Sequence, residues 1–276
     1  MEPLPRLAIV ASVQQAITSL LTTYEPEFLR LGYTLFVAFA TILIVWEGVR
    51  MMLSNESLSE HMFNFAKLLM FVSFGYALIA FYESPIPGIG VSFSNLITDQ
   101  AHAFANILEA RSLELMFDHL DELWGRFVQP DAWSILANLI YWLLLIVVTI
   151  AKAVSLAIVA FGLIASAVCA LLGPIFVPFF IVPKLDWLFW SWFKAFIQYS
   201  FIPVVAFAFL MIFERFIFQY LTTLPEGITE DYYLVYGVQA LVVIGVFAVG
   251  ILLVPTLTNS IFSGRAGGSV LPERLG

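Results

Sequence analysis

Residues 132–183 form one apolar block in which Lys152 is the only charged residue. About 20 apolar residues span the hydrocarbon core of a bilayer, so a block of this length predicts at least one membrane crossing. The whole chain of 276 residues is 61% hydrophobic and 12% charged, with a mean hydropathy of +0.95. Soluble domains are far less apolar than this. We therefore expect an all-α, polytopic integral membrane protein.

The number of crossings within the block follows from the positive residues around it, because positive residues near span ends stay on the cytoplasmic side. The three positive groups that flank the predicted spans are Arg50 with Lys67, Lys184 with Lys194, and Arg265 with Arg274. If all three are cytoplasmic, the block crosses an odd number of times, and three crossings would need roughly 54 residues. The charges therefore favour one helix over residues 132–172, roughly 60 Å long. Two crossings, with a turn near Lys152, remain the alternative.

Four further apolar segments predict membrane spans, at residues 29–53, 65–82, 196–218 and 233–257. We thus expect five transmembrane helices, or six in the alternative, with a long central helix and an amphipathic acidic extramembrane segment. Pro26 and the two glutamates beside it predict a turn before the first span. The predicted organisation is an N-terminal amphipathic segment at 1–28, a transmembrane hairpin at 29–82, an acidic periplasmic segment at 83–131, a transmembrane core at 132–262 and a glycine-containing tail at 263–276.

A helical period of 100° per residue places most polar and small residues of the central block on one stripe. The stripe comprises Ser134, Asn138, Tyr141, Lys152, Ser155, Gly162, Ser166, Ala170 and Gly173. We expect it to face a neighbouring copy or a lumen, with Lys152, Asn138 and Ser155 as pore-lining or subunit-contact candidates, because a charge buried in lipid is costly.

Three other ionisable residues, Glu47, Glu214 and Arg215, lie at membrane depth and are candidates for the same roles. For Glu47, snorkelling at the span end or an i,i+3 pair with Arg50 is the favoured explanation. Adjacent residues point to different faces of a helix, so Glu214 and Arg215 each need a partner or a water-filled cavity. Small residues spaced by four predict close helix packing. The residues with this spacing are Gly162, Ser166 and Ala170.

The end of the central helix is predicted from Gly173 and Pro174, because the residue before a proline resists helical dihedral angles. Tryptophans beside lysines mark a headgroup boundary. The segment from Pro174 to Trp192 is therefore expected to turn at the cytoplasmic interface. The residues of this predicted turn are Gly173, Pro174, Pro178, Pro183, Trp187, Trp190 and Trp192.

Residues 83–131 carry eight acidic residues against Arg111 and Arg126. Within them, "LELMFDHLDELWGRF" places its apolar residues on one helical face and its acids on the other. This apolar face either rests on the protein's own spans or docks a partner protein, since an acidic helix is repelled by anionic headgroups. The candidate docking residues are Leu113, Phe117, Leu120, Trp124 and Phe127.

No pattern for catalysis or metal binding is visible, so we expect a protein that is not an enzyme. The chain contains no P-loop glycine pattern and no His-Glu-x-x-His sequence, and Cys169 is its only cysteine. No cofactor is expected, although a bound phospholipid is compatible with this composition. The 12 Lys and Arg residues against 20 Asp and Glu give no footprint for tight binding of nucleic-acid phosphates.

Three stretches of the C-terminal half carry a family resemblance. "ALLGPIFVPFF", "WLFWSWFKAFIQYSFIPVVAFAF" and "LVPTLTNSIFSGRAGG" combine a Gly-Pro helix end, an aromatic stretch before a span, and a glycine-rich tail. Over residues 133–268 the chain resembles the TrbL family, the polytopic inner-membrane subunits of bacterial type IV secretion and conjugal transfer systems.

The resemblance implies a translocation-channel subunit that forms a homo-oligomeric ring, a pentamer, in the bacterial inner membrane. Its implied partners are a periplasmic stalk, scaffold proteins, cytoplasmic ATPases, membrane lipids, and protein or single-stranded DNA in transit. The alternatives are a polytopic transporter and a membrane scaffold without a pore. A transporter is expected to show paired broken helices in matching halves, and the proline-broken stretch has no counterpart in the first half.

Overall fold

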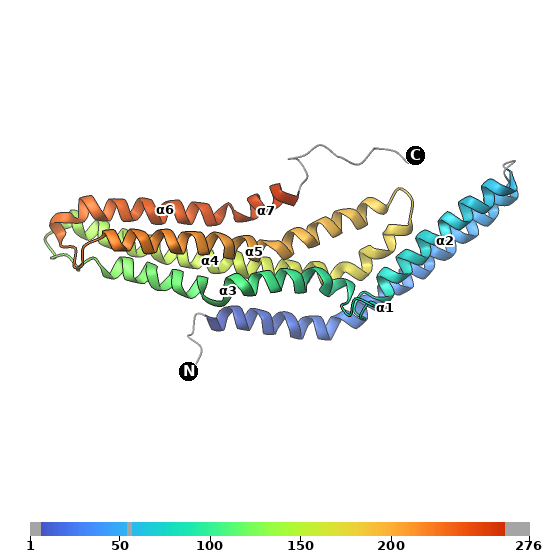
Figure 1. The fold of residues 1–276 in the computed structure, drawn as a ribbon, viewed down its shortest axis with the longest axis horizontal. Coiled ribbons are helices and arrows are strands. Elements are labelled where there is room, and N and C mark those ends of the chain that lie inside the picture. The colour runs from blue at the N-terminus through green and yellow to red at the C-terminus, as the bar shows by residue number, and fades with distance from the viewer. Residues whose placement is uncertain (1–6, 54–56, 263–276) are drawn as a thin grey trace. The chain divides into compact units, whose positions relative to one another are not determined.

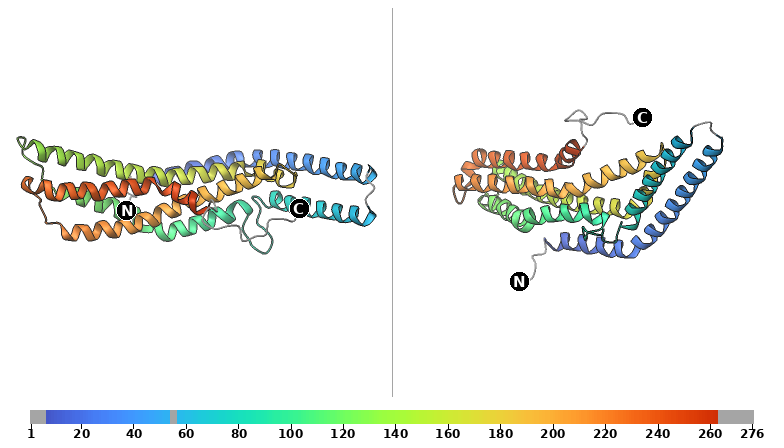
Figure 2. Two further views of the ribbon diagram at one scale, coloured as in Figure 1. Left: turned by 90° about the horizontal axis from the view of Figure 1, so that it is seen from above. Right: turned by 45° about the vertical axis from the view of Figure 1, so that its right-hand side comes forward.

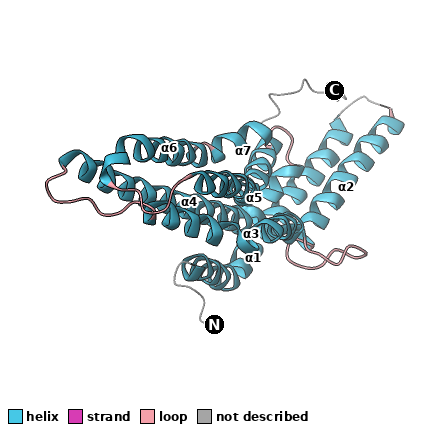
Figure 3. Ribbon diagram, turned by 60° about the vertical axis from the view of Figure 1, so that its left-hand side comes forward, coloured by secondary structure: helices cyan, strands magenta, loops and turns pink. Residues whose placement is uncertain are grey.

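The computed structural model describes residues 7–53 and 57–262, and every regular element in these ranges is a helix (Figure 3). The predicted tail at 263–276 lies outside them. The α-helices are α1 (Leu7–Leu53), α2 (Leu58–Ala80), α3 (Phe93–Gly125), α4 (Ile135–Phe176), α5 (Asp186–Thr223), α6 (Val238–Leu252) and α7 (Val254–Phe262). A 3-10 helix at Val177–Ile181 follows α4, and a 3-10 helix at Glu230–Tyr232 and a π-helix at Tyr233–Gly237 precede α6.

Five helical segments in the described ranges are long and apolar enough to cross a membrane. They are Ser12–Leu53, Leu58–Ala80, Ile135–Ile181, Asp186–Thr223 and Glu230–Leu252. The predicted fold class, a polytopic helical membrane protein, is therefore confirmed. The 33-residue helix α3 is not among the five, because its acidic residues lower its mean hydropathy.

The central block folds as one continuous helix. α4 runs for 42 residues from Ile135 to Phe176 and passes through Lys152 without a break. This arrangement agrees with the prediction of one crossing and excludes the alternative turn near Lys152. A helix of this length exceeds the roughly 30 Å thickness of the hydrocarbon core, because each residue adds about 1.5 Å.

The turn predicted at Pro26 is wrong. α1 continues for 47 residues through Pro26 and joins the predicted N-terminal segment to the first span. A proline inside a helix removes one backbone donor and bends the helix without having to end it. α1 bends along its length (Figure 1), so the signal that predicted a turn produces a bend.

The predicted helix end is also displaced. α4 passes Gly173 and Pro174 and ends at Phe176. The turn then lies between Val177 and Leu185, with Lys184 in a left-handed conformation at φ 73°. The three tryptophans expected in the turn, Trp187, Trp190 and Trp192, instead belong to α5, which begins at Asp186. An acidic residue in the first helical turn stabilises a helix start.

The described residues divide into two compact units, and α1, α3, α4 and α5 each have residues in both. Unit 1 contains residues 7–11, 101–163 and 200–262, and unit 2 contains residues 12–53, 57–100 and 164–199. In unit 2, α1 and α2 lie side by side as a hairpin (Figure 2). The ends of α4 and α5 pack on this hairpin through an aromatic core that includes Phe36, Tyr82, Phe189, Trp192 and Phe196.

Unit 1 is a bundle of α3, α4, α5 and α6 (Figure 1). Its core contains the apolar face of α3, in which Leu113, Phe117, Leu120 and Phe127 are buried. The Trp124 ring packs on the Tyr141 ring of α4, with centroids 5.5 Å apart. The candidate docking face is therefore not available to a partner, and the alternative that it rests on the protein's own spans is the one observed. An amphipathic helix buries its apolar stripe wherever apolar surface is nearest.

Candidate functional site

The charge of Lys152 is satisfied inside unit 1. Its amine forms an ion pair with the carboxylate of Asp121 on α3, and only 16% of the Lys152 side chain is exposed. The same amine lies 5.8 Å from the centroid of the Phe117 ring, also on α3. A cation held by a carboxylate and an aromatic face is stabilised in a poorly hydrated place. Lys152 therefore fastens α4 to α3.

A second pair of ionisable residues connects α3 to α5. The Nδ1 atom of His119 lies 3.4 Å from a carboxylate oxygen of Glu214. Both side chains are mostly buried, and the His119 ring also packs on Phe218, with centroids 5.3 Å apart. Glu214, which the sequence places at membrane depth, thus has a partner in His119. The contact is an ion pair when the imidazole is protonated.

The outer face of α3 is acidic, whereas the outer faces of the neighbouring helices are mostly apolar. The α3 acidic row consists of Glu114, Asp118, Asp121 and Glu122, of which Asp118 and Glu122 are exposed. The large exposed apolar residues of α4, α5 and α6 include Leu139, Trp142, Ile146, Ile150, Ile212, Phe216, Val242, Val246 and Val249. Hydrocarbon can surround the apolar faces but not the acidic row. The acidic row therefore requires water or a protein neighbour.

Two loops lie together at one end of unit 1. We name residues 126–134 and 224–232 the paired loops. Phe127 and Ile228 form a parallel bridge, in which the Val128 N–H donates to the Ile228 carbonyl at 3.0 Å and the Ile228 N–H donates to the Arg126 carbonyl at 2.8 Å. The charge rule predicted that the segments containing these loops share one side of the membrane. Their contact agrees with that prediction.

Arg126 and Tyr233 hold the paired loops in place. The Arg126 guanidinium donates to the Leu224 carbonyl at 3.3 Å and to the Glu122 carboxylate at 2.8 Å. The Tyr233 hydroxyl donates to the Val128 carbonyl. The bonds to Leu224 and Val128 supply donors to backbone carbonyls of the loops, which buried irregular backbone requires.

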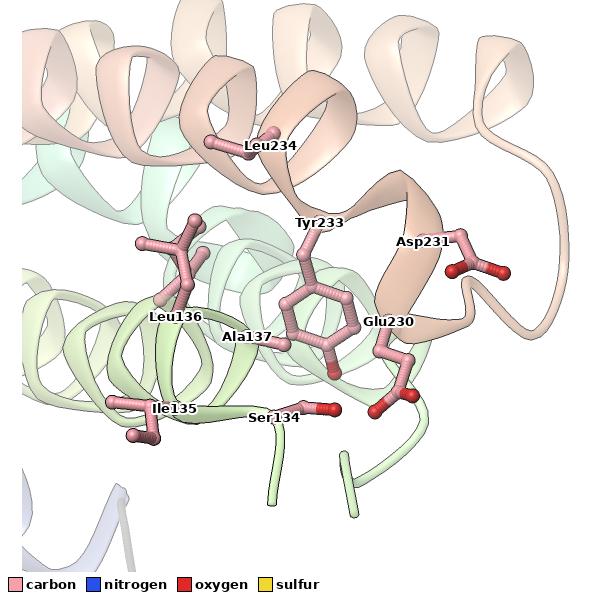
Figure 4. Close-up of a pocket in the computed structure, with 9 residues that line it drawn as sticks. Ser134, Ile135, Leu136, Ala137, Glu230, Asp231, Tyr233 and Leu234 are labelled. Carbon is pink, nitrogen blue, oxygen red and sulfur yellow. The ribbon is translucent and has the colours of Figure 1, made fainter. Parts of the chain in front are cut away.

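A cavity of about 250 Å³ opens beside the paired loops (Figure 4). Its apolar wall comes from the first turns of α4, and its polar side contains Ser134, Glu230 and Tyr233. The Glu230 carboxylate accepts a hydrogen bond from the Asp131 N–H at 3.3 Å. Asp231 also lines the cavity, so a ligand here meets negative charge next to apolar surface.

A larger cavity, of about 650 Å³, lies between α3 and α5 in unit 1. Its lining residues are Leu115, His119, Glu214, Arg215, Phe218 and Gln219. Both signs of charge are present, because Glu214 and Arg215 are adjacent on α5. Arg215 forms no ion pair with any residue in the part of the chain that the structure describes.

Unit 2 contains a pair of carboxyl groups near the end of α2. The Glu83 and Glu25 side chains share a hydrogen bond. Partial burial of Glu83, followed by the charge of Glu25 and this hydrogen bond, raises the pKa of Glu83 to about 7. One Glu83 oxygen is buried without a hydrogen-bond partner. Two carboxylates this close cannot both be ionised without repulsion, so the pair favours a bound proton.

The polar stripe of α4 faces other helices of the same chain. Ser155 is fully buried and its hydroxyl donates to the Ala151 carbonyl at 2.8 Å. The Asn138 amide donates to the carbonyls of Asp131 and Ser134 at 2.7 and 3.1 Å. The Ser155 hydroxyl and the Asn138 amide thus have hydrogen-bond partners within the chain, and their expected role in lining a pore or contacting another subunit stays a prediction.

The remaining predicted site residues have structural surroundings. Glu47 is buried in α1, with its carboxylate 3.9 Å from the Arg50 guanidinium. Gly162 lies against the ring of Pro203, so that an added Cβ atom would be 2.7 Å from the proline Cδ atom. Ser166 and Ala170 are buried in unit 2. Pro178 is buried in the turn after α4, whereas Pro183 is exposed.

The sequence identified Lys152 and Glu214 as charges at membrane depth but did not identify the residues that they contact. Asp121 and His119 appeared only as members of an acidic helix, and nothing in their spacing identified Lys152 or Glu214 as a contact. The sequence did contain a signal for one long-range contact, in which the Tyr82 hydroxyl donates to the Ala170 carbonyl. Pro174 leaves the Ala170 carbonyl without its helical donor, and a buried carbonyl needs a replacement donor.

No group of three or more His, Cys, Asp or Glu side chains in the described ranges could hold a metal ion. Among known families, the model described as TrbL/VirB6 plasmid conjugal transfer protein matches residues 40–254 of the chain. No curated protein matches the chain.

Proposed function

Since the chain belongs to the TrbL/VirB6 family of plasmid conjugal transfer proteins, we propose that it is a translocation-channel subunit of a type IV secretion or conjugation machine. In this proposal the protein is not an enzyme, resides in the bacterial inner membrane and assembles into a homo-oligomeric ring, a pentamer. The ring supports the passage of protein or single-stranded DNA. Separate cytoplasmic ATPases supply the energy.

The observation that carries the proposal is the contrast between the α3 acidic row and the apolar outer faces of the other helices in unit 1. An acidic face on a bundle whose other outer faces are mostly apolar has to point away from the hydrocarbon of the bilayer. A closed ring of identical subunits provides such a place, because each copy turns the same face toward the centre. The polar face that we assign to the centre is therefore on α3 rather than on α4.

An acidic lining is compatible with passage and not with retention. Single-stranded DNA is repelled by carboxylates and is not held by them, because tight binding of nucleic acid depends on neutralising its phosphates with Lys and Arg. In this proposal the α3 acidic row gives the channel a lining with low affinity for single-stranded DNA, and the ATPases drive the DNA past it.

The paired loops are the surface that we assign to the periplasmic stalk and scaffold proteins. They expose Trp133, Val128 and Tyr232 together with the acids Glu226 and Asp231. Exposed aromatic side chains are enriched in the contact regions of protein interfaces. This surface replaces the buried apolar face of α3 as the docking candidate.

Cysteine accessibility tests the assignment of the central face. In a Cys169→Ala background, Asp118→Cys and Glu122→Cys are expected to react with a charged, membrane-impermeant thiol reagent in assembled machines, because they contact water. Ile146→Cys and Val246→Cys, at exposed apolar positions, are the matched controls and are expected to stay unmodified. Modification of the controls with protection of both α3 positions would reverse the assignment.

Native mass spectrometry of the detergent-extracted protein tests the ring. A closed oligomer with a water-accessible centre is expected. A monomer that transports a small solute would favour a polytopic transporter, and a monomer without transport would favour a membrane scaffold.

A further inference from the structure

The cavity between α3 and α5 contains a guanidinium with no assigned role. Arg215 is exposed and forms no ion pair within the described ranges. Glu214, next to it in the sequence, turns toward α3, where its carboxylate lies 3.4 Å from His119 Nδ1. Gln219, one turn further along α5, also lines the cavity and adds an amide donor. A guanidinium with a neighbouring amide is a strong donor set for a phosphate group.

The surface around Arg215 is suited to lipid. On α5 the exposed residues nearest to it in sequence are Met211, Ile212, Phe216 and Phe218, and Ile212 is 70% exposed. Arg215 lies about two helical turns before the end of α5 at Thr223, a position from which an arginine reaches the headgroup layer. A cation on an apolar surface at this level meets phospholipid rather than a soluble anion.

The shape of the cavity suits an amphiphile. Its polar side is formed by His119, Glu214 and Arg215, and its apolar side by Leu115 and Phe218. Its volume of about 650 Å³ falls within the usual range of small-molecule sites, about 300 to 1,000 Å³. One cation and one anion side by side match a headgroup that also carries both charges.

We propose that this cavity binds the headgroup of a zwitterionic phospholipid with a primary ammonium, of the phosphatidylethanolamine class. The phosphodiester accepts hydrogen bonds from Arg215 and Gln219, and the ammonium donates to Glu214. The acyl chains leave past Leu115 and Phe218 onto the apolar face of α5. The lipid headgroup then fills the cavity between α3 and α5.

Binding is measured on the purified full-length protein, so that the result does not depend on transport or on ring assembly. Delipidated protein is titrated, with native mass spectrometry as the readout, with phosphatidylethanolamine, phosphatidylcholine and phosphatidylglycerol of identical short acyl chains. The expected order of affinity places phosphatidylethanolamine first, because its ammonium can donate hydrogen bonds while phosphatidylcholine has no N–H and phosphatidylglycerol has no cation.

Two substitutions separate the two contacts. Arg215→Gln is expected to weaken binding of all three lipids about tenfold or more, the effect of losing a charge-assisted contact. Glu214→Gln is expected to leave phosphatidylcholine binding unchanged and to remove the preference for phosphatidylethanolamine. Arg30→Gln, at an exposed arginine of α1, is the matched control and should bind as the wild type does.

Equal affinity of the wild type for the three lipids would overturn the proposal, because equal affinities indicate lipid that surrounds the protein without a specific headgroup site. Wild-type affinity in Arg215→Gln would overturn it as well. If Arg215→Gln fails to fold, as judged by gel filtration in detergent, two results still test the proposal. They are the order of wild-type affinities for the three lipids and the lipid preference of Glu214→Gln.

Discussion

The Tyr82 hydroxyl donates to the Ala170 carbonyl at 2.5 Å, at the place where Pro174 has no N–H to donate. Tyr82 is fully buried, and the indole N–H of Trp192 donates to the neighbouring Cys169 carbonyl at 2.8 Å. Two side chains from other elements thus bond the carbonyls that precede a proline. In hydrocarbon an unsatisfied backbone carbonyl costs several kcal/mol, so the Tyr82 bond compensates the Ala170 carbonyl where α4 passes Pro174 and continues to Phe176.

Replacing Tyr82 by phenylalanine is expected to destabilise the protein by about 1–3 kcal/mol, because the Ala170 carbonyl stays buried without a donor. Thermal unfolding in detergent measures the effect. Tyr24→Phe, at an exposed tyrosine of α1, is the control and should change little. In a Pro174→Ala background the restored N–H can donate to Ala170, so the cost of Tyr82→Phe should shrink. An equal cost in both backgrounds would refute the link between the hydroxyl and the proline.

Replacing Gly32 by alanine is expected to loosen α1 from α4. A Cβ atom at this position would lie 2.6 Å from the backbone carbonyl carbon of Pro174, which cannot move aside as a flexible side chain could. Such overpacking costs about 1–3 kcal/mol. Gly48→Ala, on the same helix with nothing within 4 Å of the added atom, is the matched control. Alanine favours helix, so the control should unfold at the wild-type temperature or slightly above it.

Replacing Lys152 by leucine is expected to reduce substrate transfer, because the ion pair that connects α4 to Asp121 of α3 is lost. The pair is partly exposed, so its coupling energy should be about 1 kcal/mol. Asp121→Asn should have a similar effect, and the exchange Lys152→Asp with Asp121→Lys should recover part of the loss. Conjugal transfer frequency and the unfolding temperature are the two readouts. Normal transfer by Lys152→Leu would leave the pair without a functional role.

Replacing Glu83 by glutamine is expected to stabilise the protein at high pH. Because the pKa of Glu83 rises from 4.5 to about 7 on folding, the folded protein binds more protons than the unfolded chain between these values. Stability from this residue is therefore complete below pH 4.5 and is lost as the pH rises through about 7. The unfolding temperature of Glu83→Gln should exceed that of the wild type above pH 7 and approach it in acid. Asp99→Asn, at an exposed acid of the same unit, is the control for the loss of one negative charge.

The sequence predicts the fold well where a pattern is long. The apolar block at 132–183 contains a single charged residue, so its helical phase and the positive residues around it favoured one continuous helix over two, and α4 confirms that helix. The spans around it follow from hydropathy alone. The error at Pro26 arose because a proline signals both a turn and a bend, and the choice depends on whether helical residues continue on both sides.

The site was harder to predict because each contact joins residues far apart in the chain. The stripe on α4 was identified correctly as polar, yet its partner could have been water, another copy or the same chain, and periodicity is identical in the three cases. The same ambiguity applied to the apolar face of α3. Only the position of α3 beside α4 and α5 decides that Lys152, Leu120 and Phe127 face inward.

The bond between Tyr82 and Ala170 also orders the events of biosynthesis. Synthesis proceeds from the N-terminus, and Tyr82 precedes Ala170 by 88 residues. The hairpin of α1 and α2 therefore enters the bilayer first and presents its hydroxyl before the ribosome has made the proline that needs it. A fragment that starts after α2 would insert α4 with the Ala170 carbonyl unsatisfied in the hydrocarbon core. We expect such a fragment to be degraded.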